Sequence, residues 1–165
     1  MPGAVLNPAP PAPITQPELN VQQPPEWAGA PFRVLLFRIG AMQFSVPLPM
    51  LRAVSELAEP PHQVPGQPAW HLGLVRYRGE SLMVADLGAL LGIRAVCDDP
   101  QYLLVIGDGD VAIACDALGE ALTAEPAAVR WRRGGEARAW LAGLLTGPMC
   151  ALLDVAEIDR LIRHG

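Results

Sequence analysis

The stretch VPGQPAWHLGLVRYRGESLMVADLGALLG, residues 64–92, decides the fold. It holds two short apolar runs, Leu74–Tyr77 and Ser81–Ala85, and the join between them is far too short for a helix. Antiparallel pairing of the two runs is therefore favoured, with Gly79 supplying the backbone angles of a tight turn. Asp86 follows the second run, where it can accept hydrogen bonds from the backbone N–H groups of a helix start. The stretch thus predicts two strands and then a short helix.

Similar short apolar runs, separated by Gly or Pro, extend outward from this stretch between Phe32 and the end of the chain. They are Val34–Ile39, Met42–Val46, Tyr102–Ile106, Val111–Cys115 and Cys150–Leu153. Together with the first two runs they predict about seven strands, joined mostly by turns and therefore mostly antiparallel.

Helices are predicted at three places, Met50–Leu57, Leu87–Leu91 and Val155–Arg163. The last has the clearest signal, because Asp154 can cap it and Glu157 stands three residues further on, as in a capping box.

Residues 1–31 differ from the rest in composition. They hold nine of the 18 prolines and no basic residue, and they show no hydrophobic periodicity. Such a segment cannot bury enough apolar surface to offset its chain entropy. We expect a disordered proline-rich tail at 1–31 and a folded domain at 32–165. Trp27 is a candidate docking anchor within the tail, although a Trp that folds back on its own domain is the simpler explanation.

The composition argues against several classes of protein. A net charge of -5 disfavours a nucleic-acid partner, because binding to phosphates needs clustered basic residues. No run approaches the roughly 20 apolar residues that cross a bilayer, so we expect a cytoplasmic protein without direct membrane insertion. The 3 cysteines lack the spacing of a disulfide framework or a zinc knuckle.

We find no catalytic motif in the sequence. None of the histidines has metal-ligand spacing, and there is no nucleophile elbow or phosphate-binding loop. Gly107–Asp110 is better explained by a hairpin turn than by a calcium loop. Three acids each follow an apolar run, a position that suits backbone capping; these acids are Asp86, Asp116 and Asp154. The sequence predicts a protein that is not an enzyme and that has neither metal nor cofactor.

The order of residues in the deciding stretch resembles the CheW-like domain family. Its pattern is a Pro-x-x-Pro turn, an aromatic residue, a Gly, an Arg-Gly turn and an apolar strand that ends in Asp-Leu. The positions in register are Pro65, Pro68, Trp70, Gly73, Arg78, Gly79, Asp86, Leu87 and Gly92. Runs near the two ends of 32–165 agree as well. The chain departs from the pattern at Ala53, Arg76 and Met83, where the family usually has an acid, an Asn and a Pro.

The resemblance implies a mainly β fold of two small five-stranded β-barrels, with a hydrophobic groove between them and a C-terminal helix. Members of the family are non-catalytic adaptors. The cytoplasmic tip of a methyl-accepting chemoreceptor lies in the groove, and a barrel surface docks on the regulatory domain of a CheA-type histidine kinase.

The resemblance also implies which residues bind these partners. The receptor- or kinase-binding candidates are Val46, Leu48, Leu51, Val54 and Arg78. The four apolar ones are explained equally well as ordinary core. The structural turn residues are Gly73, Gly79 and Asp86.

Two functions stay open at this point. The first is a chemosensory adaptor at membrane-associated chemoreceptor arrays, serving chemotaxis or type IV pilus control. The alternative is a CheW-like localisation or polar-tethering protein, whose proline-rich tail recruits a ParA-type ATPase or a polar protein.

Overall fold

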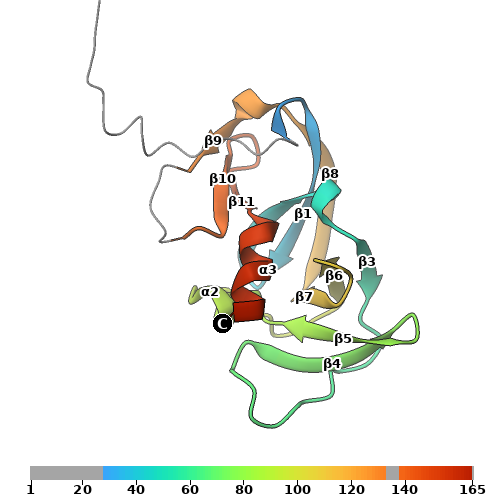
Figure 1. Ribbon diagram of the computed structural model, residues 1–165. Helices are drawn as coiled ribbons and strands as arrows, with labels where there is room; N and C mark the ends of the chain where they lie inside the picture. Colours follow the sequence, from blue (N-terminus) through green and yellow to red (C-terminus); the bar gives the residue numbers. More distant parts are fainter. Residues whose placement is uncertain (1–27, 133–137, 165) are drawn as a thin grey trace, which may run out of the picture.

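The computed structural model describes residues 28–132 and 138–164, in which two β-sheets are accompanied by two short α-helices (Figure 1). The elements in chain order are β1 (Phe32–Ile39), β2 (Met42–Pro47), η2 (Leu48–Met50), β3 (Ala53–Glu56), β4 (His71–Tyr77), β5 (Glu80–Ala85), α2 (Leu87–Leu91), β6 (Tyr102–Ile106), β7 (Val111–Cys115), β8 (Ala117–Ala124), η3 (Pro126–Ala128), β9 (Val129–Trp131), β10 (Leu141–Leu145), β11 (Cys150–Leu153) and α3 (Val155–His164).

The first sheet has six strands in the order β8-β1-β2-β11-β10-β9. β1 and β2 form the expected opening hairpin, in which Ile39 pairs with Met42. β11 lies parallel to β2, with Ala151 opposite Phe44. The last strand of the chain, β11, therefore pairs with one of the first two strands in the same sheet.

The second sheet has five strands in the order β3-β6-β7-β5-β4. β4 and β5 form the predicted hairpin, in which Tyr77 pairs with Glu80 across a two-residue turn. The φ angles of these two turn residues, 52° at Arg78 and 81° at Gly79, are both positive. Positive φ at both central residues is the mark of a type I′ turn, whose twist matches that of the flanking strands.

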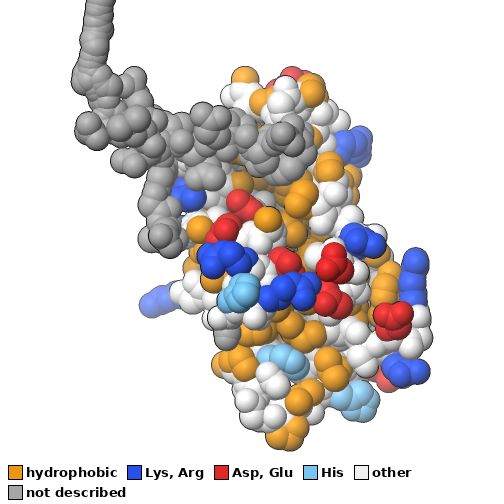
Figure 2. Space-filling view, viewed as in Figure 1, with side chains coloured by type: hydrophobic (Ala, Val, Ile, Leu, Met, Phe, Trp, Pro, Cys, Tyr) orange, Lys and Arg blue, Asp and Glu red, His pale blue; other side chains and the backbone are white. Residues whose placement is uncertain are grey.

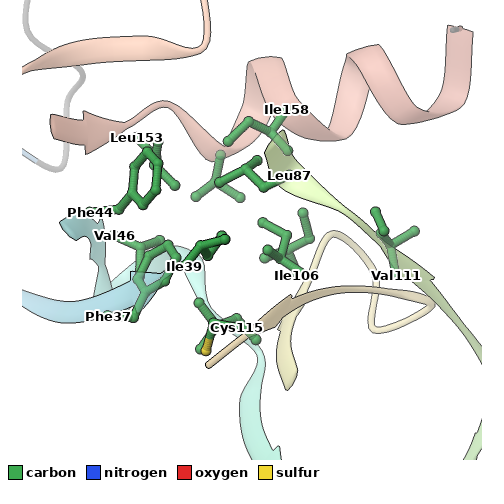
Figure 3. Packing of buried hydrophobic residues seen from close by; sticks show 14 of the residues in the cluster. Phe37, Ile39, Phe44, Val46, Leu87, Ile106, Val111, Cys115, Leu153 and Ile158 are labelled. Carbon is green, nitrogen blue, oxygen red and sulfur yellow. The ribbon is translucent and has the colours of Figure 1, made fainter. Parts of the chain in front are cut away.

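One core cluster joins the two sheets (Figure 3). Phe37 and Phe44 of the first sheet stack with their ring centroids 5.6 Å apart. Ile106 of the second sheet and Ile158 of α3 pack into the same cluster and are fully buried. Separating the sheets would expose these side chains to water, so the two halves behave as one body.

Helix α3 follows the first sheet and is tied to the second by one ion pair. Arg163 binds Asp110, in the turn after β6, at 2.9 Å, and it also binds Asp159 of the same helix at 3.0 Å. The hydrogen bonds from Arg163 lower the pKa of Asp110 below its ordinary value. Figure 2 shows basic and acidic side chains side by side across the middle of the face on which α3 lies.

Of the three aspartates expected to accept hydrogen bonds from the turn or helix that follows them, Asp86 and Asp154 do so, whereas Asp116 accepts from residues that precede it. Asp86 accepts a hydrogen bond from the backbone N–H of Ala89 at 3.3 Å, and Asp154 accepts one from Glu157 at 3.1 Å. Asp116 accepts from the backbone N–H groups of two distant residues, which are Gly40 and Asp99.

The mainly β fold of two small units with a C-terminal helix is confirmed, although the first unit has six strands rather than five. The helix predicted at Met50–Leu57 is wrong, because this segment forms the last residue of η2 and then β3. Pairing with β6 decides the outcome, since alternate side chains of the segment turn toward the core, as a strand requires. In a capping box the Glu157 carboxylate would accept a hydrogen bond from the backbone N–H of Asp154. Instead, the Glu157 carboxylate pairs with Arg160 at 2.7 Å.

The predicted tail spans 1–31, and its residues 1–27 lie outside the described residues. The described chain begins at Ala28, which is 1% exposed and packs in a second core cluster beside Phe32. Core packing therefore starts before the expected domain boundary at residue 32.

Candidate functional site

β3 and β4 are the two edge strands of the second sheet. They face each other across a gap that is only partly closed by backbone pairing, and we call this gap the seam. At one point the chain between them bridges the seam, because the backbone N–H of His62 donates to Leu74 at 2.8 Å and the N–H of Leu74 donates back at 2.9 Å. Elsewhere the seam is hollowed. One hollow of about 230 Å³ lies between Ser55–Leu57 and Val75–Tyr77, and another of about 220 Å³ lies beside Arg52 and Arg78.

Gly73 allows the close approach that bridges the seam. Its φ is 135°, and a Cβ at this position would lie 2.3 Å from the carbonyl oxygen of His62. No side chain fits there, so the predicted structural role of Gly73 has a direct physical cause.

Arg78 is exposed on the turn between β4 and β5, and its guanidinium lies 5.4 Å from the centroid of the Tyr77 ring. Tyr77 in turn lines both hollows. Within the described residues neither Arg78 nor Arg52 takes part in an ion pair. A partner carboxylate or carbonyl could therefore approach the donors of Arg78 without displacing an internal acid.

The four apolar candidates do not share one environment. Val46 is 1% exposed within the shared core cluster, so its role in this structure is packing and its side chain has no accessible face. Leu48 and Leu51 are half-buried against the same cluster, where the chain passes from the first sheet to the second. Val54 is 41% exposed on β3. Binding of a partner by Leu48, Leu51 and Val54 stays a prediction.

The remaining sequence candidates have structural positions or lie outside the description. Gly79 supplies the second positive φ of the β4–β5 turn, and Asp86 caps α2. Trp27, the proposed tail anchor, lies outside the described residues.

Reasoning from the sequence missed Arg52 and Tyr77 as surface residues of the seam. The sequence carried no clear signal for Arg52, because exposed and half-buried positions alternate along 52–57 in the structure but apolar and polar residues do not alternate there in the sequence.

The cysteine thiols near Asp116 are kept protonated, and therefore unreactive, by raised pKa values. Burial, followed by the charge of Asp116, raises the pKa of the Cys115 thiol to about 12. The pKa of Cys97 is raised for the same two reasons, and its thiol lies 3.5 Å from a carboxylate oxygen of Asp116. Across residues 28–132 and 138–164, no group of three or more His, Cys, Asp or Glu side chains is placed to hold a metal ion. In the same ranges no helix combines the length and apolar character needed to cross a membrane.

Comparison with known proteins places these features in a family. Residues 33–161 match the family model of the CheW-like domain. The probable chemotaxis protein CheW of Rhizobium etli is 28% identical over 93 residues, and the chemotaxis protein CheW of Rhizobium meliloti is 27% identical over 93 residues. Each alignment covers 54% of this chain and 59% of the relative, which is less than two thirds of the relative's length.

A solved structure shows the same fold. The crystal structure of the scaffolding protein TtCheW from Thermoanaerobacter tengcongensis matches with a TM-score of 0.62 at 16% sequence identity. The match covers 75% of this chain and 89% of that one.

Proposed function

The chain belongs to the CheW-like domain family, and on that premise we propose that it is a non-catalytic adaptor that couples chemoreceptors to a CheA-type histidine kinase. The observation that carries the proposal is Arg78, an exposed guanidinium without an ion pair to any described residue, held beside a hollow of the seam. A φ of 52° disfavours Arg and favours Gly or Asn. The geometry of the turn therefore does not account for an Arg at this position, whereas binding of a partner does.

The shared core suggests how such an adaptor transmits a signal. A partner that contacts Leu48, Leu51 or Val54 touches the connection between the sheets, and a partner at Arg78 touches the second sheet alone. Leu48 and Leu51 pack on the cluster that joins the sheets, and Tyr77 beside Arg78 packs on a separate cluster within the second sheet. Because β6 and β7 contribute side chains to both clusters, a displacement at either surface is transmitted rather than absorbed. No chemical step is required of the protein, and its place in the cell would be at chemoreceptor arrays.

The proposal is tested by titrating the full chain against the receptor cytoplasmic tip and against the kinase regulatory domain. We expect binding to both, and we expect Arg78→Ala to weaken at least one of them roughly tenfold, the scale of losing one interface anchor. Arg94→Ala is the matched control, because Arg94 is also exposed but lies after α2, away from the seam. Unchanged affinity of Arg78→Ala for both partners would remove Arg78 from the site.

The alternative role as a polar tether predicts a different result. A tether retains binding through residues 1–31 and binds neither kinase nor receptor. Recovery of a kinase and a receptor with the full chain in a pull-down would reject it.

A further inference from the structure

The hollow of the seam beside Arg52 and Arg78, about 220 Å³ in volume, combines apolar and charged walls. Part of its wall belongs to the core cluster within the second sheet, through Ala53, Leu82 and Val105, and we call this part the floor. Another part is formed by exposed charged residues, which are Arg52, Arg78 and Glu80, and we call this part the rim. The hollow can therefore contact both methylene groups and an anion.

The two guanidinium groups of the rim come from opposite sides of the seam. Arg52 directly precedes β3, and its backbone N–H donates to the carbonyl oxygen of Val105 at 2.8 Å. Arg78 lies in the turn between β4 and β5, where its guanidinium is 5.4 Å from the centroid of the Tyr77 ring, the distance of a cation–π contact. Arg52 is thus held by its backbone and Arg78 by its side chain, which lowers the cost of ordering them around a ligand.

The charges of the rim are not balanced within the structure. The ion pairs among the described residues are made by Arg160 and Arg163, so neither Arg52 nor Arg78 has a carboxylate partner there. Glu80 lines the same hollow but forms an ion pair with neither of them. Two positive groups and one negative group leave a net positive charge at the rim, which favours an anionic ligand.

We propose that this hollow binds a glutamate side chain of the protein partner, with the carboxylate held between the guanidinium groups of Arg52 and Arg78. The inference rests on the proposed adaptor function and names the chemistry that the partner presents at that site. The donors of an Arg side chain match the two oxygens of a carboxylate. A glutamate suits the hollow better than an aspartate, because its additional methylene group covers more of the apolar floor.

A carboxylate bound in this way would connect the two sides of the seam. Arg52 directly follows Leu51, which packs on the cluster that joins the two sheets, whereas Arg78 belongs to the hairpin of β4 and β5. The bound glutamate is then a second link across the seam, in addition to the backbone bridge between His62 and Leu74.

Isothermal titration calorimetry of the full chain against the receptor cytoplasmic tip and against the kinase regulatory domain tests the proposal. Arg52→Ala should weaken binding of the same partner that Arg78→Ala weakens, by roughly tenfold. The double variant should lose less than the product of the two single losses, because both side chains bind one carboxylate. Glu80→Gln should tighten binding, since it removes a negative charge from the rim. Arg76→Ala is the matched control, because Arg76 is exposed on β4 but lines the other hollow.

The partner's side of the contact is tested by replacing each of its exposed glutamates with Gln. One replacement should weaken binding to the wild-type chain roughly tenfold and cause no further loss with the variant that lacks both Arg52 and Arg78. Binding of neither protein by the wild-type chain would refute the proposed function and the inference with it. If a partner binds and Arg52→Ala, shown to be folded by circular dichroism, binds it as tightly as the wild type, the inference alone is overturned. A scan in which no glutamate depends on the two arginines would also overturn it.

Discussion

Replacing Gly73 with Ala should strongly destabilise the fold. An added Cβ would lie 2.3 Å from the carbonyl oxygen of His62 and 3.1 Å from the backbone nitrogen of Gln63. Both are backbone atoms, so the chain must move and the two hydrogen bonds that join His62 to Leu74 must break. Their loss costs about 1 kcal/mol each, and an Ala at a φ of 135° costs about 1–3 kcal/mol more. We expect a loss of about 3–5 kcal/mol in the free energy of unfolding, a large part of the stability of a domain of this size.

The measurement is urea denaturation of the full chain followed by circular dichroism, with Gly79→Ala as the matched control. Gly79 has a positive φ of 81°, but no atom lies within 4 Å of its added Cβ. Only the backbone penalty applies there, and it is about 1–2 kcal/mol. If Gly73→Ala lost no more stability than Gly79→Ala, the close approach across the seam would have no energetic role and the account of Gly73 would be refuted.

Three further outcomes follow from other parts of the structure. Asp154→Ala should lower the free energy of unfolding by about 1 kcal/mol, since its side chain caps the third residue of α3; an unchanged denaturation midpoint would contradict this. Deleting residues 1–27 should leave the melting temperature nearly unchanged, whereas deleting residues 1–31 also removes buried Ala28 and should lower it; equal melting temperatures would argue against that packing. Because burial raises the pKa of Cys115 to about 12, its thiol should stay protonated and react slowly with a thiol reagent at pH 8 in the native protein but fast in urea, and rapid native reaction would contradict the burial.

The sequence by itself determined the features that depend on neighbours along the chain. The hairpin around Gly79, the cap at Asp86 and helix α3 were all predicted, because turn chemistry, capping and helical periodicity act within a few residues. The ordered pattern of residues 64–92 was also enough to predict the family, since it samples several such local features in one order.

Only the tertiary structure decided the features that depend on residues far apart in sequence. Residues 53–56 became a strand because β6 was available to pair with them, and local propensity could not show this. Gly73 is required because His62 lies against it, and Val46 is core because both sheets and α3 close over one cluster.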